Sequence, residues 1–238
     1  MSTGKIITTP TNILVLDTSS SACVLALYRG DECFEASRKA GRTHGQILLP
    51  LVESLVGEAG LTLACLELIV LGQGPGSFTG LRIGVGVAQG LAFGLGIPVA
   101  QVSSLAALAL QARRFHGADH VIAALHARAD EVFAGTYAAS GDLIQAVGPE
   151  TVGAVVDLDL DPATNWFGAG DGWQLHELFE GKLGREVPFV EQMVPGADDL
   201  LALGRAAHAS GASRTADLVT PVYLREQVAE RQASGPKA

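Results

Sequence analysis

A glycine-rich run that contains hydroxyl side chains is the first place in the sequence where chemistry is expected. The run Gly72–Gly80 (GQGPGSFTG) lies between a predicted strand, residues 66–71, and a predicted helix, residues 79–95. Backbone N–H groups at such a strand-to-helix turn can bind an anion. The candidate phosphate-binding residues in this loop are Gly74, Gly76 and Ser77. The alternative is a tight turn whose glycines let the strand and the helix pack closely.

The standard nucleotide-binding and nucleophile motifs do not fit this loop. A dinucleotide fingerprint would need glycine at position 77 or 79, which are Ser77 and Thr79, and no acid follows at the spacing that binds a ribose. A phosphate loop of the Walker type needs a lysine, and none occurs between Lys39 and Lys182. Ser77 is also not central in a Gly-x-Ser-x-Gly motif, so a nucleophile elbow is excluded.

A second candidate site is the turn after the first predicted strand, residues 13–17. Asp17 ends this strand and Thr18 and Ser19 follow it. A carboxylate beside hydroxyl groups could hold Mg²⁺ and a nucleotide phosphate. The alternative is a local turn in which the aspartate side chain satisfies the backbone. The corresponding position in a later, similar hairpin is His126, so a second acid for a metal–phosphate pair is missing.

Histidines and cysteines give little support for a metal site. His116 and His120 have the spacing of one helical face, but Gly117 between them makes a regular helix doubtful, and a bare pair is a common coincidence. The cysteines are odd in number and form no Cys-x-x-Cys motif; they are Cys23, Cys33 and Cys65. This usage predicts a reducing compartment and argues against a disulfide framework or a zinc site.

Charge is distributed very unevenly along the 238 residues. The formal net charge is −9, yet only Glu67 and Arg82 are charged between positions 61 and 112. Residues 142–199 hold twelve acidic residues against Lys182 and Arg185. No strong basic run occurs, so we predict no autonomous binding to nucleic acid.

The uncharged segment from residue 83 to 99 is short for a membrane span, which needs about 20 residues. The first residues lack the apolar core of a signal peptide. We therefore predict a cytoplasmic protein that does not contact a membrane.

The predicted helix at 79–95 is unusual because small residues recur along it every four positions. Five glycines inside one helix cost roughly 5 kcal/mol relative to alanine, and close approach of another element would offset this cost. That element is the chain's own sheet, a second subunit, or both on opposite faces of the helix. The candidate subunit-interface residues are Gly80, Gly84, Gly86, Ala88, Gly90 and Gly94.

The alternation of strands and helices predicts an α/β fold. An offset of 109 residues superposes a predicted hairpin at 13–28 on one at 122–137, which suggests two similar lobes. We place an N-terminal lobe with the glycine-rich helix at residues 1–112 and a C-terminal lobe at 113–238. A late helix, 198–209, is the candidate to return to the N-terminal lobe.

Several motifs together resemble one protein family. These are ILVLDTS at 13–19, His44 followed by LLP at 48–50, GPGSFTGLRIGVG at 74–86, EVF at 131–133 and PVYLR at 221–225. Over about residues 12–230 the chain resembles the bacterial TsaB family of tRNA threonylcarbamoyladenosine biosynthesis proteins. The resemblance implies a fold of the actin-like ATPase (ASKHA) superfamily, with two ribonuclease-H-like lobes.

The resemblance also implies partners. TsaB proteins pair with a larger paralogue, TsaD, which transfers a threonylcarbamoyl group to the adenosine beside the anticodon of tRNAs that decode ANN codons. A small ATPase, TsaE, joins that complex. The chain is then expected to contact tRNA only through the complex and to have no cofactor of its own. ATP and a metal belong to the partner subunits. The glycine-rich helix and the turn after Asp17 are expected to form the interface with TsaD, or alternatively with a second copy of the chain.

Catalytic TsaD proteins carry an Asn-His-x-x-x-His metal pair after the glycine-rich helix and the next strand. The matching positions here are Ser104 and Leu108, which cannot replace imidazole ligands. We therefore predict no catalytic residue and no metal, and a scaffold that activates TsaD and recruits TsaE. One alternative is an independent weak ATPase or sugar-kinase-like phosphotransferase that uses Asp17 and the glycine loop. Another is a self-associating protein without a transferase partner.

Overall fold

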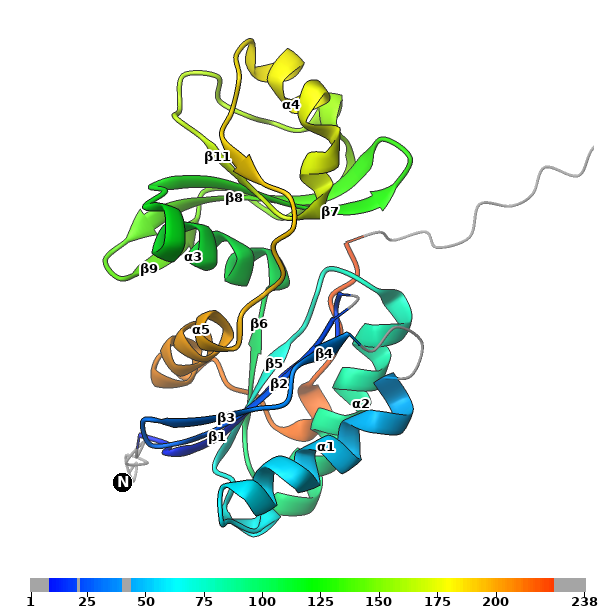
Figure 1. Cartoon of the computed structure of the whole chain (residues 1–238), viewed down its shortest axis with the longest axis vertical. Helices are drawn as coiled ribbons and strands as arrows, with labels where there is room; N and C mark the ends of the chain where they lie inside the picture. The colour runs from blue at the N-terminus through cyan, green and yellow to red at the C-terminus, as the bar shows by residue number, and fades with distance from the viewer. Residues whose placement is uncertain (1–8, 21, 40–43, 225–238) are drawn as a thin grey trace, which may run out of the picture.

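The computed structural model describes residues 9–20, 22–39 and 44–224, and within them two lobes lie one above the other (Figure 1). Each lobe is built on a six-stranded mixed sheet. Two helices, α3 (Ser104–His116) and α5 (Ala197–Ala209), pack against each other between the two sheets. The predicted α/β architecture with two similar lobes is confirmed.

The first sheet has the strand order β3-β2-β1-β5-β6, with β4 paired to β2. Its strands are β1 (Asn12–Asp17), β2 (Ala22–Arg29), β3 (Glu32–Glu35), β4 (Arg38–Lys39), β5 (Leu68–Gly72) and β6 (Val99–Val102). The β1–β2 pair is antiparallel, whereas β5 and β6 run parallel to β1. The predicted hairpin and β5 are therefore confirmed, with β5 starting two residues later than predicted.

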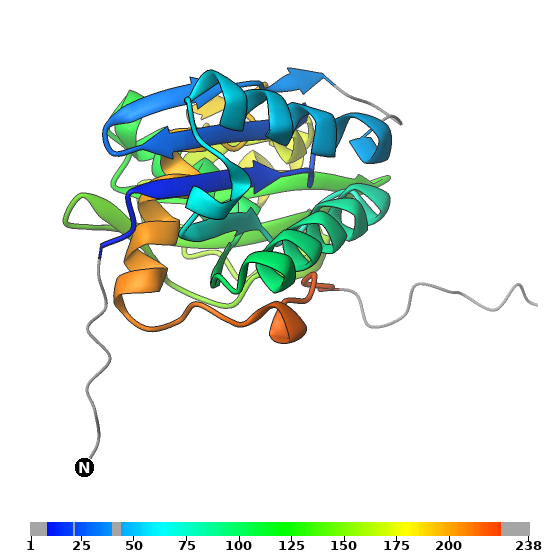
Figure 2. The same ribbon diagram turned by 90° about the horizontal axis from the view of Figure 1, so that it is seen from below.

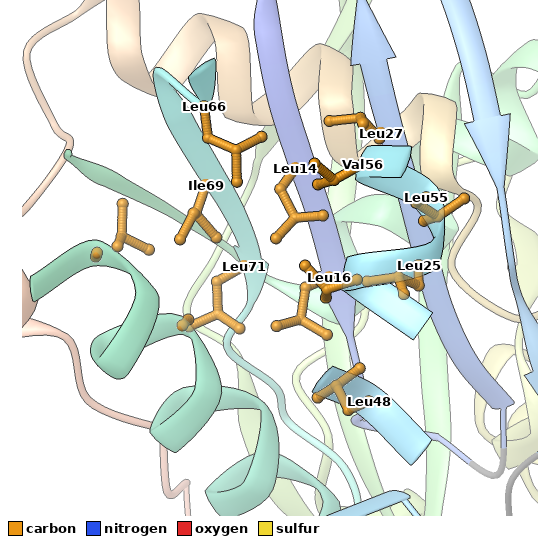
Figure 3. Close-up of a cluster of buried hydrophobic side chains, with 14 of the residues drawn as sticks. Leu14, Leu16, Leu25, Leu27, Leu48, Leu55, Val56, Leu66, Ile69 and Leu71 are labelled. Atoms are coloured by element: carbon orange, nitrogen blue, oxygen red, sulfur yellow. The ribbon is translucent and has the colours of Figure 1, made fainter. Parts of the chain in front are cut away.

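Both faces of the first sheet are covered, which explains why its strands read as continuous apolar runs. On one face, Leu14 and Leu16 pack beneath α1 (His44–Glu58) and α2 (Phe78–Leu95), as Figure 3 shows. On the other face, Ile13 and Val15 pack against α5. Figure 2 shows α1 and α2 together on the outer side of this sheet. Successive side chains of β1 thus belong to two different cores.

The second sheet repeats this arrangement with the order β10-β8-β7-β11-β12, and β9 pairs with β8. Its strands are β7 (His120–Arg128), β8 (Glu131–Ser140), β9 (Leu143–Ala146), β10 (Thr151–Ala154), β11 (Phe167–Ala169) and β12 (Phe189–Val190). One face packs on α3, and the other packs on Trp173 and on Phe179 of α4 (His176–Leu183). Short 3₁₀ helices complete the chain: η2 (Leu63–Cys65), η3 (Val155–Asp157), η4 (Asp171–Leu175) and η5 (Ala216–Leu218).

The two hairpins match in topology but differ by one residue in register. In the first, Ile13 lies opposite Tyr28, whereas in the second Tyr137 lies opposite Val121 rather than Ile122. The second hairpin also has an irregularity between His126 and Arg128, after which Arg128 pairs with Glu131 next to the turn. The offset of 109 residues therefore aligns the first strands correctly and the second strands one residue out of register.

Two helices, α3 and α5, each pack on a different lobe from the one that their place in the sequence would suggest. α3, which falls within residues 1–112 except for its last turn, packs on the second sheet through Leu105 and Leu108. α5, which comes late in the chain, packs on the first sheet through Leu200 and Leu201. The division at residues 112 and 113 stays a prediction about the chain, while the cores group α5 with the N-terminal lobe.

The segment after α5 runs along the first lobe beside α2. Arg214 exchanges both backbone hydrogen bonds with Val99. Further on, Gln89 of α2 donates through Nε2 to the carbonyl of Val219 at 2.9 Å, and the Val222 N–H donates to Gln73 O at 3.0 Å. The predicted ordered piece at 221–225 is described as far as Leu224, and Arg225 lies outside the described residues.

Among the described helices, α2 is the one whose length and composition would allow it to cross a membrane. In the structure one side of α2 packs against the first sheet. The buried residues on that side are Gly80, Leu81, Gly84, Val85, Ala88 and Ala92. We therefore interpret α2 as a helix of the lobe.

Candidate functional site

The structure brings the two candidate phosphate sites together. The Ser77 N–H donates to the Ser19 carbonyl at 2.6 Å, and the Thr18 hydroxyl donates to the Gly80 carbonyl at 2.7 Å. The glycine loop after β5 is thus hydrogen-bonded directly to the turn after β1. Ser77 also caps α2, because its side chain accepts from the Gly80 N–H.

The glycines of this loop are required by close approach to that turn. A Cβ at Gly72 would lie 2.3 Å from the Asp17 carboxylate, and one at Gly76 would lie 2.2 Å from the Ser19 carbonyl oxygen. Gly74 has a φ of +99°, which a residue with a side chain rarely adopts. These contacts match the alternative of a tight turn. A role for Gly74, Gly76 and Ser77 in phosphate binding stays a prediction.

Asp17 is engaged inside the chain. Its residue is 2% exposed, and Oδ1 accepts the Ser19 N–H at 2.5 Å. Ser104 at the start of α3 places its hydroxyl 3.2 Å from Asp17 Oδ2 and 2.9 Å from Ser19 Oγ. Burial, together with the charge of Asp17, raises the pKa of the Cys23 thiol to about 11. The carboxylate therefore joins β1 to α3, and its role toward a nucleotide stays a prediction.

A second polar network continues from this junction into the second lobe. Ser103 caps α3 by accepting the backbone N–H groups of Leu105 and Ala106, and its hydroxyl donates to Glu150 Oε1. The buried Tyr137 of β8 donates to the same oxygen at 2.6 Å. Burial and the Glu150 charge raise the pKa of Tyr137 above its ordinary value. Spacing could not reveal this network, because Glu150 lies in a connecting segment far along the chain from Ser103.

The two positions that match the paralogue's metal ligands are inside the protein. Ser104 and Leu108 are fully buried, and Leu108 packs in the core between α3 and the second sheet. His116 ends α3 and stacks on Phe167, whereas His120 begins β7, so the two histidines share no helix face. Across residues 9–20, 22–39 and 44–224, no group of three or more His, Cys, Asp or Glu side chains is arranged to hold a metal ion.

His126 occupies the place in the second hairpin that Asp17 has in the first, and its surroundings differ. Its residue is exposed, its N–H donates to Asp171 Oδ1 at 2.8 Å, and its ring lies 3.1 Å from the Ala129 carbonyl. The duplicated fold therefore does not duplicate the acidic turn.

The small residues of α2 separate into two rows with different surroundings. A Cβ at Gly80 would lie 2.0 Å from the Thr18 carbonyl oxygen, and one at Gly84 would lie 2.4 Å from Thr18 Oγ1. Ala88 has no exposed surface. Packing within the chain accounts for the small size of these three residues, and a role for Gly80, Gly84 and Ala88 in a subunit interface stays a prediction.

The other row is open. A Cβ at Gly86, Gly90 or Gly94 would meet no atom within 4 Å. Phe93, on the same side of the helix, is 84% exposed. We call this surface the open stripe of α2; its residues are Phe78, Arg82, Gly86, Gly90, Phe93 and Gly94.

One end of the open stripe is organised by aromatic contacts with the C-terminal segment. The Arg82 guanidinium carbon lies 3.9 Å from the ring centroid of Phe78, and Arg82 Nε donates to the Tyr223 hydroxyl at 3.0 Å. Phe78 and Tyr223 are 42% and 43% exposed, and their ring centroids are 5.6 Å apart.

The two-lobed α/β fold agrees with a match to a known protein family. Residues 36–232 match the model described as TsaD: tRNA N6-adenosine threonylcarbamoyltransferase. The two sheets and this match define the class: an α/β protein of the actin-like ATPase superfamily with two ribonuclease-H-like lobes.

Comparison with individual relatives shows which family within this class the chain resembles. The chain is 34% identical to the tRNA threonylcarbamoyladenosine biosynthesis protein TsaB of Haemophilus influenzae, over 94% of this chain and 97% of the relative. It is 35% identical to TsaB of Escherichia coli, over 94% and 98%. A solved structure, YeaZ from Pseudomonas aeruginosa, superposes with a TM-score of 0.82 at 41% identity, covering 90% of this chain and 100% of that one. The chain belongs to the TsaB family.

Proposed function

We propose that this chain is a non-catalytic subunit in tRNA threonylcarbamoyladenosine biosynthesis and that it pairs with a TsaD-type transferase through the open stripe of α2. Involvement in that biosynthesis follows from membership of the TsaB family. The pairing and the absence of catalysis are the further steps of the proposal.

The observation that carries the pairing is the open row of glycines. Glycine in a helix interior is destabilising by about 1 kcal/mol relative to alanine, and no atom within the described chain approaches Gly86, Gly90 or Gly94. A second helix that packs closely on this row would make glycine necessary there. The exposed ring of Phe93 would then be buried as well, which adds the apolar area typical of a permanent interface.

The second part of the proposal concerns chemistry. Ser104 and Leu108 stand where the paralogue holds its metal, and both are packed into the fold. We place the metal and the ATP on the partner subunits, with TsaE recruited to the pair and tRNA reached through the complex. No cofactor is assigned to this chain.

Two variants test the pairing directly. Gly86→Leu and Gly90→Leu should abolish co-purification with TsaD while leaving a folded monomer, because each adds a large side chain where backbones must approach. Gly181→Leu is the matched control, since Gly181 of α4 is also helical and free of neighbours within 4 Å but lies on the second lobe. If Gly86→Leu and Gly90→Leu both still co-purify with TsaD, the open stripe of α2 is not the interface.

The same variants address self-association. If the isolated chain forms a homodimer through the stripe, sedimentation should show that Gly86→Leu and Gly90→Leu convert it to monomer. A homodimer that survives both substitutions would use another surface.

The competing function is an independent ATPase or phosphotransferase. Purified chain that turned over ATP alone, with activity lost in Asp17→Ala, would support it. We expect no turnover, because the Asp17 carboxylate already accepts from the Ser19 N–H and the Ser104 hydroxyl. The glycine loop is also hydrogen-bonded to the turn after β1 through Ser77 and Ser19.

A further inference from the structure

The contact between the lobes contains a buried carboxyl group with incomplete hydrogen bonding. Asp199, in the first turn of α5, is 1% exposed, and its side chain has no exposed surface. Oδ2 lies 3.3 Å from Nη2 of Arg114 on α3. Oδ1 is buried and has no hydrogen-bond partner. A buried ionised carboxylate needs more compensation than one long ion pair provides.

A second unsatisfied acceptor lies at the same interface. The Oε1 of Gln111 on α3 is also buried without a partner. Gly196, which precedes α5, lies between the two side chains, since a Cβ there would be 2.6 Å from Asp199 Oδ2 and 3.0 Å from Gln111 Nε2. Two buried acceptor oxygens without a donor at one interface favour an added proton, because a neutral carboxyl group supplies an O–H donor.

The charges around Asp199 come from both lobes. Arg114 is shared, because its Nη1 also lies 3.3 Å from Asp198 Oδ2. Tyr28 of β2 donates to Asp198 Oδ1 at 2.6 Å, and Cys33 of β3 lies beside Tyr28. A cavity of about 410 Å³ adjoins Asp199 and is lined also by the charged side chains of Arg113, Arg114, Asp119, Asp142 and Asp198. Arg113 is already paired with Asp119 at 3.0 Å, so it adds little positive charge for Asp199.

The balance of these groups favours the neutral acid. Burial raises the pKa of Asp199 to about 6; Arg114 and the backbone N–H of Asp199 itself oppose the rise, and Asp198 adds to it. The folded-state pKa thus lies above the ordinary value near 3.9. The contribution of Asp199 to stability is therefore complete below that ordinary value and is lost as the pH rises through about 6.

We propose that the α3–α5 interface is a proton-sensitive contact between the lobes, tight when Asp199 is neutral and loosened when Asp199 is ionised. The ionised carboxylate gains water if α3 and α5 separate slightly, and the adjoining cavity provides the route for that water. Because α3 carries the second sheet and α5 the first, loosening this contact changes how firmly the two lobes are held together.

The first test is thermal unfolding of the full chain at two pH values. Asp199→Asn keeps the shape of the neutral acid and supplies a donor, so it should raise Tm by about 5 °C at pH 7.5 and by about half as much at pH 5, where part of the stabilisation by the neutral acid remains. Equal shifts at both pH values, or a loss of Tm at pH 7.5, would overturn the proposal.

A second measurement does not depend on that variant. The side-chain carboxyl ¹³C signal of Asp199 in the wild-type chain should titrate with a midpoint near 6. In Asp198→Asn the midpoint should fall, because one negative neighbour is removed and Arg114 is freed for Asp199. A wild-type midpoint at the ordinary value of about 4 would contradict the assignment.

The loosening itself is measurable by amide hydrogen exchange. After correction for intrinsic rates, protection of α3 and α5 should decrease between pH 5 and pH 7.5, while protection of α1 stays constant. In Asp199→Asn the two helices should be equally protected at both pH values. Uniform behaviour of α1, α3 and α5 in the wild type would refute a local contact.

Discussion

At the scale of single residues, the surroundings of each small residue in α2 depend on which side of the helix it occupies. Gly84 and Gly86 are two positions apart, yet a Cβ at Gly84 would lie 2.4 Å from Thr18 Oγ1, whereas one at Gly86 would meet nothing within 4 Å. The hydroxyl of Thr18 cannot move freely, because it donates to the Gly80 carbonyl. Identical residue types thus serve intramolecular packing in one row and an open surface in the other.

This difference predicts opposite effects of one substitution. Gly84→Ala should destabilise the chain by about 1–3 kcal/mol through overpacking, whereas Gly86→Ala should stabilise it by about 0.5–1 kcal/mol through helix propensity. Urea unfolding of the two variants measures both changes. Shifts of the same sign would show that the two rows are not distinct.

At the scale of elements, the C-terminal segment and α2 form one surface. Hydrogen bonds from Gln89 to Val219 and from Val222 to Gln73 hold the segment along the first lobe. Tyr223 adds a ring contact to Phe78 and accepts a hydrogen bond from Arg82. The exposed end of the stripe is therefore built from residues that are about 140 positions apart in the sequence.

Removal of the Tyr223 ring should release this segment without unfolding the lobe. In Tyr223→Ala, the Val222 amide should exchange severalfold faster, with little change in Tm, because half of the Tyr223 side chain is already exposed and the cores do not include it. Tyr223→Phe is the control that keeps the ring and removes only the hydroxyl. Unchanged exchange in Tyr223→Ala would show that the backbone bonds alone hold the segment.

At the scale of the whole molecule, the two lobes differ in net charge. The net charge is −9, and residues 142–199, most of which build the second lobe, hold twelve acidic residues against two basic ones. The open stripe on the first lobe carries Arg82 as its one charged residue. The acidic residues of the second lobe disfavour binding of a polyanion there, and the largely apolar stripe on the first lobe is suited to the apolar partner surface that we propose.

This distribution predicts that the isolated chain does not bind tRNA. In an electrophoretic shift assay at 0.15 M salt we expect no complex below about 1 μM, because specific or strong nonspecific binding requires phosphate neutralisation by Lys and Arg. The same assay with the partner transferase present should show binding. Submicromolar binding of tRNA by the chain alone would contradict the proposal that the chain contacts tRNA only through the complex.

Residues close in the sequence were sufficient to predict β1, β5, the glycine-rich helix and the family. Strand periodicity, helix periodicity and short motifs such as the one at 74–86 depend only on neighbouring residues. Short elements such as β9 to β12 and α4 gave no clear pattern. α1 runs from His44 to Glu58 and contains Pro50, a residue that local rules would place outside a helix interior.

The tertiary structure alone decided which residues face which partner. It assigned Gly80 and Gly84 to Thr18, engaged Asp17 with Ser104, and placed Asp199 opposite Arg114. It also returned α5 to the first sheet and left Gly86, Gly90 and Gly94 open. Each of these outcomes joins segments far apart in the chain. A periodic pattern states that a residue is buried or exposed, whereas the identity of its neighbour is fixed only when the lobes pack together.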